Sequence, residues 1–363
     1  LSLITIAQSN NRLNREFNTT VFCFFGLSFM ILLGILQFKD IDGGFMKVLV
    51  TGGCGFIGSH VVDGFVERGY DVVIVDDLST GKTENKNDKA RLHIASICDD
   101  GIEEIFEQER PDIVNHHAAQ ISVPLSAKIP LFDAEVNIKG TIRLLELSKK
   151  YGVKKFIFAS TGGAIYGDAD KIPTAEDYVP EPASPYAISK FSGEKYIRYY
   201  YGQFNLNYTI LRYSNVYGPR QIPHGEAGVV SIFTESLLAG QHPTLYYFEG
   251  EEDGMVRDYC YVKDIARASL IASEGEKVGI FNIGTGKGTC TRDLYNSIIN
   301  ALRKKGVKIP EAFNEPRRGF ARAGEIRAST LDVKKKKKEL GWEAGYGLND
   351  GLSETVEWYL NKA

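Results

Sequence analysis

The chain has 363 residues, and 43% of them are hydrophobic, so it can bury a large core and is not a peptide-sized scaffold. Its 43 basic and 46 acidic side chains are well mixed and give a net charge of -3, which predicts no nucleic-acid partner. Its five cysteines are far apart and form no CxxC pair, which argues against a disulfide framework and a metal site and for a reducing compartment.

The N-terminal 1–45 contain an apolar stretch, 17–38, that has no charged side chain and is long enough to span a bilayer. Three interpretations are open: an extension outside the working protein, a membrane anchor, or a helix docked on the protein. We favour the first, because no small-residue cleavage site follows the stretch and Met46 stands immediately before the first expected strand. A membrane partner is expected only if 17–38 is an anchor.

After Met46, short apolar runs alternate with helical patterns. The run 47–51 leads into a glycine loop, an amphipathic helix continues over 61–69, and 71–77 is a second buried strand. Further strands are expected at 112–119, 153–160 and 208–214, with helices at 131–150 and 185–204. The alternation predicts an α/β fold, namely a Rossmann doubly wound parallel sheet covered by helices on both faces.

Beyond Gly218 the sequence changes to loops rich in Pro and Gly and to short helices, which indicates a smaller C-terminal α/β domain for the substrate. We expect a first domain over 46–218, completed by a return to the sheet at about 259–284. The second domain is expected over 219–258 and 285–363. Within it, the lysine run 334–338 is interpreted as a solvated helix face.

The segment TGGCGFIG (51–58) follows a strand and opens a helix, which is the context that makes a glycine motif credible. Glycines allow a sharp turn and let backbone N–H groups approach a pyrophosphate at the positive end of a helix dipole. The loop residues expected to bind this cofactor are Gly52, Gly55, Phe56, Ile57 and Gly58. Asp76 ends the second strand, where a carboxylate binds ribose hydroxyls and repels a 2′-phosphate, so NAD is expected rather than NADP.

Tyr186 and Lys190 are spaced i,i+4 in SPYAISKFSGEKY, so on a helix they share one face. A neighbouring ammonium favours the phenolate and brings the phenol closer to useful base strength. Ser160 and Thr161 end the strand just upstream, and ligands of open α/β sheets bind beyond the carboxyl ends of strands. We expect Thr161 to be the hydrogen-bond partner of the reacting substrate hydroxyl.

Five motifs, in this order and spacing, carry a family resemblance: TGGCGFIGSH, FASTGGAIYG, SPYAISK, LRYSNVYGPRQ and VRDYCYVKDIA. They resemble the extended short-chain dehydrogenase/reductases, most closely the bacterial and archaeal UDP-glucose 4-epimerases with a TGG motif. The resemblance covers nearly all of 46–363. Many epimerases have serine where Gly162 falls, so the resemblance moves the hydroxyl role to Thr161 or Ser160.

The resemblance implies reversible C4 epimerisation of a UDP-hexose through a transient 4-keto sugar and a tightly bound NAD. In relatives, the tyrosine matching Tyr186 removes the proton of the 4-hydroxyl, and the lysine matching Lys190 holds the nicotinamide ribose. The protein then has to keep a reactive ketone sequestered while the sugar turns over. Relatives form dimers through helices matching 131–150 and 185–204, and the need for NAD places the enzyme in the cytoplasm.

Other family positions carry over one at a time. Asn137 matches an asparagine near the cofactor, and Asn215 matches one that touches the UDP-sugar phosphates. Arg257 and Arg322 match arginines that bind the pyrophosphate and the uridine ribose, for which guanidinium offers paired donors. Ser329 aligns with a position that is tyrosine in hexose-only relatives and small where N-acetyl sugars are accepted. We therefore expect UDP-GlcNAc to be a substrate as well.

Several alternatives stay open at this point. Dehydratases of the superfamily place an acidic pair before the YG of this strand end, where the chain has Gly163, Ala164 and Ile165, so elimination chemistry lacks its groups. A UDP-glucuronate 4-epimerase or another NAD-dependent nucleotide-sugar enzyme shares the same motifs. A non-catalytic NAD-binding regulator typically loses the tyrosine or the lysine, and this chain has both.

Overall fold

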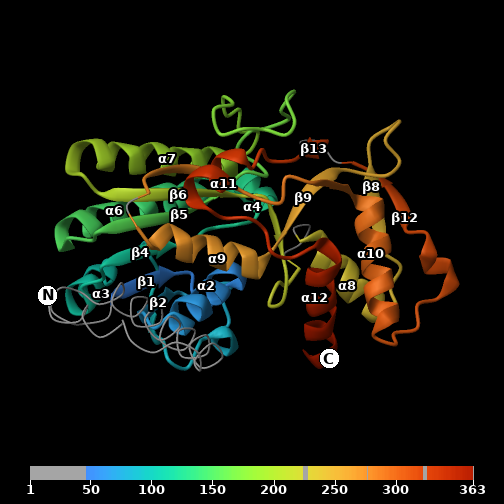
Figure 1. Ribbon diagram of the computed structural model, residues 1–363, viewed down its shortest axis with the longest axis horizontal. Coiled ribbons are helices and arrows are strands. Elements are labelled where there is room, and N and C mark those ends of the chain that lie inside the picture. Colours follow the sequence, from blue (N-terminus) through green and yellow to red (C-terminus); the bar gives the residue numbers. More distant parts are fainter. Residues whose placement is uncertain (1–45, 224–227, 276, 322–324, 363) are drawn as a thin grey trace, which may run out of the picture. The chain divides into compact units, whose positions relative to one another are not determined.

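The computed structural model describes residues 46–223, 228–275, 277–321 and 325–362. The chain divides into two units, Leu1–Met46 and Lys47–Ala363, and every described helix and strand belongs to the second (Figure 1). The apolar stretch 17–38 and Arg322 therefore lie outside the described residues. Within those residues, no helix has the length and apolar character needed to span a bilayer.

A seven-stranded sheet with parallel pairings throughout forms the centre of this unit, in the order β10-β6-β5-β4-β1-β2-β3. Its strands are β1 (Lys47–Thr51), β2 (Asp71–Asp76), β3 (Arg91–Ile94), β4 (Ile113–His116), β5 (Lys155–Thr161), β6 (Asn207–Tyr213) and β10 (Gly279–Ile283). The strand order reverses between β1 and β4, which is where such folds bind ligands. The predicted doubly wound sheet is confirmed.

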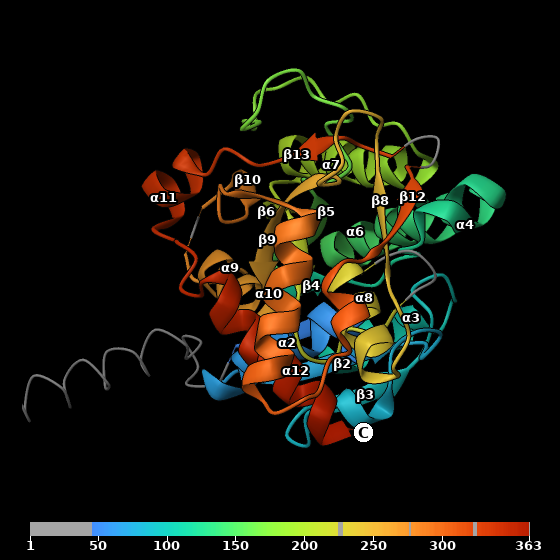
Figure 2. The same cartoon turned by 90° about the vertical axis from the view of Figure 1, so that its right-hand side faces the viewer.

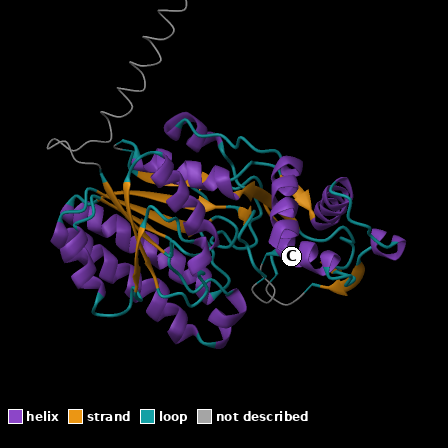
Figure 3. Ribbon diagram, turned by 90° about the horizontal axis from the view of Figure 1, so that it is seen from below, coloured by secondary structure: helices purple, strands orange, loops and turns teal. Residues whose placement is uncertain are grey.

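Helices cover both faces of the sheet (Figure 3). One face packs against α3 (Ile102–Glu109), α6 (Gly140–Tyr151) and α7 (Pro185–Phe204), and the other against α2 (Phe56–Glu67) and α9 (Val262–Ser273). The central strands are apolar on both faces because both are buried; Val48, Leu49 and Val50 of β1 are fully buried. Phe106, Leu144, Phe156 and Phe158 belong to the core on the α6 side.

The segment expected as one helix over 131–150 is interrupted. It consists of α5 (Pro130–Ala134), a π-helical turn η2 (Glu135–Lys139) and α6, preceded by the short α4 (Val123–Lys128). π-Helical turns are rare and occur frequently at functional sites. This one faces the carboxyl ends of the strands, since Glu135 and Val136 line the cavity described below.

The remaining strands form two smaller sheets. The first, called the small sheet below, joins β11 (Gly288–Cys290), β9 (Val256–Tyr261), β13 (Ala328–Ser329) and β7 (Asn215–Tyr217). The second pairs β8 (Thr244–Tyr247) with β12 (Arg317–Phe320). Helices α8 (Val229–Leu238), α10 (Thr291–Lys304) and α12 (Leu348–Lys362) group beside them around a separate apolar core (Figure 2).

Two short 3-10 turns, η1 (Thr83–Asn85) and η3 (Glu311–Asn314), and α11 (Lys334–Leu340) complete the described elements. The lysine run does form a helix, α11. The prediction that its side chains are all solvated is wrong for one lysine. Lys336 is buried, with its Nζ donating to the carbonyl of Gly284 and lying 3.7 Å from the ring centroid of Trp342. An aromatic face and a carbonyl oxygen replace the water that an exposed ammonium would have.

Candidate functional site

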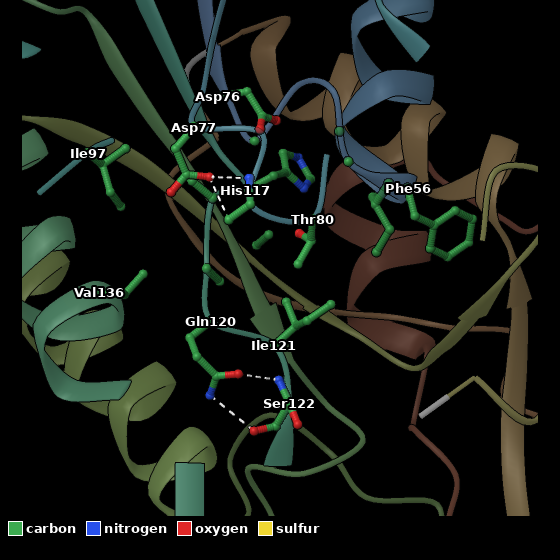
Figure 4. A pocket seen from close by; sticks show the side chains of 18 of the residues that line it. Phe56, Asp76, Asp77, Thr80, Ile97, His117, Gln120, Ile121, Ser122 and Val136 are labelled. Atoms are coloured by element: carbon green, nitrogen blue, oxygen red, sulfur yellow. Dashed lines mark hydrogen bonds between the residues drawn. The ribbon is translucent and has the colours of Figure 1, made fainter. Parts of the chain in front are cut away.

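A cavity of about 1010 Å³ opens at the carboxyl ends of the sheet strands, at the upper end of the size range for cofactor sites. Residues that follow β1, β2, β3 and β4 line it, together with the last part of β5 and the start of α7. In Figure 4, Asp76 and Asp77 lie at one end of this cavity, Phe56 lies on the α2 side, and Gln120 and Val136 lie on the opposite wall.

The glycine loop forms one wall of the cavity. Gly52 has φ +69°, and a Cβ there would lie 2.7 Å from the backbone nitrogen of Ala118. A Cβ on Gly58 would lie 2.1 Å from the carbonyl oxygen of Gly52, so neither position has room for a side chain. Gly55 caps α2 without any side-chain hydrogen bond, which leaves the first N–H groups of the helix free for an anion. The loop thus fits a pyrophosphate, and Phe56 and Ile57 line the cavity with it.

Asp76 lies at the end of β2 and is nearly buried. Its Oδ2 accepts the backbone N–H of Cys54 and its Oδ1 that of Leu78, both at 2.9 Å. Burial raises the pKa of this carboxyl, while these backbone N–H bonds oppose the rise. A carboxylate oxygen can accept a second hydrogen bond, so the arrangement fits ribose hydroxyls entering from the cavity.

Tyr186 and Lys190 both reach the cavity from the first turns of α7. This helix starts cleanly because Pro185 occupies its first turn and the Ser184 side chain accepts the N–H of Ala187. Burial raises the pKa of Tyr186 to about 12, and the charge of Asp133 adds to the rise. Burial lowers the pKa of Lys190 to about 8, and its Nζ donates to the carbonyl of Ala159 at 3.0 Å.

The ammonium of Lys190 was expected to lower the pKa of the Tyr186 phenol, but in the protein alone the pKa of Tyr186 is raised. Desolvation disfavours both charged forms, and it dominates at Tyr186 and at Lys190. A cationic ring bound beside the phenol would favour the phenolate. An oxidised nicotinamide is such a ring and would supply this positive charge. The pair is thus compatible with a cofactor-dependent base.

The two hydroxyls at the end of β5 differ in their surroundings. Ser160 lines the cavity, and its Oγ donates to Glu194 Oε1 at 2.6 Å. Glu194 is in turn paired with Arg212 through two hydrogen bonds, and this ion pair is buried. Because the Ser160 proton is engaged, its oxygen faces the cavity as an acceptor. Thr161 is half-buried and does not line this cavity.

Asn137 does not line the cavity. Its side chain instead clamps the backbone of Gln120, accepting from the N–H at 3.0 Å and donating to the carbonyl at 2.9 Å. It also donates to Asp133 Oδ1 at 2.9 Å. Gln120 is itself part of the cavity wall, so Asn137 is linked to the cofactor space through that wall.

The small sheet brings together three of the residues expected to bind substrate. Arg257 of β9 pairs in register with Ser329 of β13, and Asn215 of β7 lies opposite Tyr259, which follows Arg257 by two residues. Asn215 Oδ1 would lie 3.2 Å from a Cβ on Gly163. Arg257 is held near Glu325, with an N to O distance of 3.8 Å, and burial lowers its pKa. None of the three lines the cavity, and Arg322 lies outside the described residues.

Four residues of the site were not singled out by the sequence analysis: Asp133, Gln120, His117 and Glu194. Glu194 stands one helical turn beyond Lys190, and this spacing could have identified it. His117 lines the cavity with its ring stacked 6.1 Å from that of Tyr213, and burial lowers its pKa to about 3. Gln120 and Asp133 depend on contacts between separate segments, which no local pattern announces.

No cluster of three or more His, Cys, Asp or Glu side chains able to hold a metal ion occurs among the described residues. The four described cysteines, Cys54, Cys98, Cys260 and Cys290, are free thiols. Among the described residues, the groups that line the cavity include the Tyr186 phenol, the Lys190 ammonium, the Ser160 hydroxyl and the glycine loop.

Comparison with known proteins agrees with this geometry. The structure is similar to the UDP-glucose 4-epimerase of Thermotoga maritima solved with UDP-glucose, with a TM-score of 0.81, 48% identity and coverage of 87% of this chain and 99% of that one. It is also similar to the Thermus thermophilus UDP-glucose 4-epimerase in complex with NAD, with a TM-score of 0.80, 42% identity and coverage of 88% and 100%.

A third solved structure, the UDP-N-acetylglucosamine 4-epimerase of Methanobrevibacter ruminantium in complex with UDP-N-acetylmuramic acid, matches with a TM-score of 0.80 and 32% identity over 90% of this chain and 100% of that one. The model of the NAD dependent epimerase/dehydratase family matches residues 48–284, which is more than half of the chain. The chain belongs to the NAD dependent epimerase/dehydratase family.

Proposed function

We propose that the protein catalyses the reversible C4 epimerisation of a UDP-hexose, interconverting UDP-glucose and UDP-galactose, with a tightly held NAD. One observation carries the proposal: Tyr186 and Lys190 open into the same cavity as the glycine loop and Asp76. A dinucleotide held by that loop and that carboxylate would extend toward the phenol and the ammonium. The match to epimerases solved with UDP-glucose and with NAD supports the same assignment.

The reaction needs one base and one hydride acceptor. A bound NAD, held by the glycine loop and Asp76, would supply the acceptor for the C4 hydride and its source when the keto sugar is reduced from the other face. Tyr186 takes the proton of the 4-hydroxyl and gives it back when the ketone is reduced. Lys190 keeps donors available for the nicotinamide ribose, and its positive charge favours the phenolate once the cavity is filled.

The hydroxyls of β5 orient the sugar in this proposal. Ser160 presents an acceptor to the cavity because its proton is donated to Glu194. Thr161, the last residue of β5, is the proposed partner of the sugar 4-hydroxyl; it pairs with Tyr213, which lines the cavity. In this mechanism the protein has to keep the 4-keto sugar from water while the sugar rotates.

The UDP part of the substrate is assigned to the small sheet and the segment after β12. Asn215 and Arg257 would contact the phosphates, with Arg322 as a second cation, because guanidinium binds phosphate oxygens in pairs. Ser329 adjoins Arg257 and is small, which leaves volume for an acetamido group. We therefore include UDP-GlcNAc among the substrates.

The proposal includes a homodimer in the cytoplasm, where nucleotide cofactors are available. Helix α7 leaves Ile188, Tyr196 and Tyr199 exposed, and their spacing places them on one face of the helix. Leu131 of α5 is 85% exposed. Apolar side chains grouped in this way mark interaction surfaces, so a Tyr199→Glu variant is expected to sediment as a monomer if this face forms the dimer.

The test is an interconversion assay that starts from UDP-galactose and quantifies UDP-glucose. The wild-type protein is expected to reach an equilibrium mixture, and Tyr186→Phe to lose about 10²–10⁴-fold in kcat, the range for removing a general base. Tyr201→Phe, at the exposed end of the same helix, is the matched control and should keep full activity. Unchanged turnover by Tyr186→Phe would eliminate the proposed base.

A further inference from the structure

Asp133 is a fully buried carboxylate behind the catalytic helix. Its Oδ2 accepts from Ser189 Oγ at 2.6 Å, and its Oδ1 accepts from Gln120 Nε2 at 2.8 Å and from Asn137 Nδ2 at 2.9 Å. Every partner is an uncharged donor, and within the described residues no ion pair involves Asp133. Burying a carboxylate that no cation contacts directly is costly, which calls for a compensating role.

The three donors come from two structures that must keep a fixed relation for catalysis. Ser189 stands between Tyr186 and Lys190 on α7. Gln120 is part of the cavity wall, and Asn137 clamps the Gln120 backbone from the π-helical turn. A single carboxylate therefore joins the helix that carries the proposed base to the segment of the cavity wall that contains Gln120.

The carboxylate also acts through its charge on both members of the pair. Its negative charge raises the pKa of Tyr186 and of Lys190, although burial is the larger effect on each. The other titratable groups beside Lys190 are His116, the last residue of β4, and His117, which follows it; both stay neutral because burial and the lysine charge lower the pKa of each well below its usual value. Glu194, farther along α7, is neutralised by Arg212.

We propose that Asp133 is a positioning residue for the catalytic pair, which fixes α7 against the cavity wall and supplies the negative charge that balances the Lys190 ammonium. The inference rests on the proposed epimerase function and deepens it. Asp133 touches neither the cavity nor the reacting atoms. It therefore acts through its hydrogen bonds to Ser189 and Gln120 and through the effect of its charge on the catalytic pair.

The negative charge of Asp133 should shift the pH profile of kcat in a predictable direction. The base must be unprotonated to start the reaction, and the ammonium must be protonated. A nearby negative charge disfavours the phenolate and favours the ammonium, so it moves both the rising and the falling limb of the profile to higher pH. Removing the charge moves both limbs to lower pH, whereas a purely structural role lowers activity without moving either limb.

The first experiment compares pH profiles of kcat for the wild-type holoenzyme and Asp133→Asn, with UDP-galactose as substrate. Asparagine keeps the shape and an acceptor oxygen but not the charge. Both limbs are expected to move to lower pH by about half a unit to one unit, as for a charge acting across a few ångströms of protein. Glu103→Gln removes one negative charge from a solvent-accessible side chain of α3 and should leave both limbs in place.

The second experiment separates position from charge. Ser189→Ala keeps the carboxylate and removes its bond to α7, so kcat is expected to fall about tenfold with little change in KM and with unmoved limbs. The Asp133→Asn, Ser189→Ala double variant is expected to lose less kcat than the product of the single losses, because both act through one bond. If Asp133→Asn does not fold, Ser189→Ala still tests the positioning role by itself. A kcat equal to that of the wild type in Ser189→Ala would overturn that role.

The outcomes distinguish this inference from the proposed function. Unmoved limbs in a folded and active Asp133→Asn enzyme would overturn the role of the charge and leave the epimerase assignment intact. A wild-type protein that interconverts no UDP-sugar at C4 would remove the proposed function, and the role of Asp133 in the reaction with it.

Discussion

The cavity and the small sheet bring their functional side chains together in different ways. Around the cavity, each group lies at a strand end or on the first turns of α2 or α7, so local sequence determines its place. In the small sheet, Arg257 and Ser329 become neighbours only through the parallel pairing of β9 with β13. The local sequence therefore determines where the cofactor-binding residues lie. The position of the substrate-binding residues depends on how distant strands pair.

The largest expected effect tests the local half. Gly58→Ala places a Cβ 2.1 Å from the carbonyl oxygen of Gly52, so the loop must open and cofactor copurification and activity should both be lost. Ultraviolet absorbance and native mass of the purified protein measure the bound NAD. Gly202→Ala on α7 is the control, because its Cβ meets nothing within 4 Å. A Gly58→Ala protein with full cofactor content would contradict the assignment of the loop.

The next effect tests the tertiary half. Arg257→Lys keeps the charge and loses the paired donors, so KM for UDP-galactose should rise about 10–100-fold, as expected when charged hydrogen bonds are lost. Cofactor content should not change, because Arg257 does not line the cavity. Steady-state kinetics with absorbance of the same sample measure both quantities. An unchanged KM, or a loss of bound NAD, would mean that the two halves are not divided as proposed.

A third prediction uses stability to sharpen the comparison. Lys190→Met removes a buried ammonium whose pKa in the folded protein is about 8 instead of 10.5. The burial cost is fully present below about pH 8, where folded and unfolded chains both hold the proton, and it fades as pH rises toward 10.5.

The Lys190→Met variant should therefore be inactive yet more stable at pH 7 by about 1–3 kcal/mol, and the gain should shrink by pH 10. Urea unfolding at both pH values measures this. Lys195→Met, on an outer turn of α7, is the control. A variant that is less stable than the wild type at pH 7 would show that the lysine is not a strained functional group.

The smallest expected effect concerns sugar choice. Ser329→Tyr fills the volume next to Arg257, so turnover of UDP-GlcNAc should fall about tenfold relative to UDP-galactose. Competition between the two sugars in one reaction gives the ratio directly. Equal losses on both substrates would place the acetamido group elsewhere.

The sequence was sufficient for the parts of the fold whose signals are local. The apolar runs at β1, β2, β5 and β6 are continuous because these strands are buried on both faces, and each was predicted close to its observed bounds. β3 was missed because it is a short edge strand with no fully buried residue, so its pattern differs little from a loop. The interruption of 131–150 by a π-helical turn likewise has no sequence periodicity of its own.

The candidate site divides in the same way. The glycine loop, Asp76 and the Tyr186–Lys190 pair line one cavity, and the binding and catalytic roles predicted from their motifs stay proposals. Asn137 was expected near the cofactor, yet its amide is engaged with the Gln120 backbone and Asp133, and its role stays a proposal. Asp133 itself could not be recognised, because a single aspartate in a helix becomes unusual only when three donors from separate segments converge on it.

The most direct test of the account is the isotope content of UDP-glucose made from UDP-galactose in D2O. Hydride that leaves C4 and returns from the same bound NAD never exchanges with solvent, so the product should contain no carbon-bound deuterium by NMR and mass spectrometry. Deuterium at C4 of the product would contradict the account, because the hydrogen would then have been exchanged as a proton with the solvent.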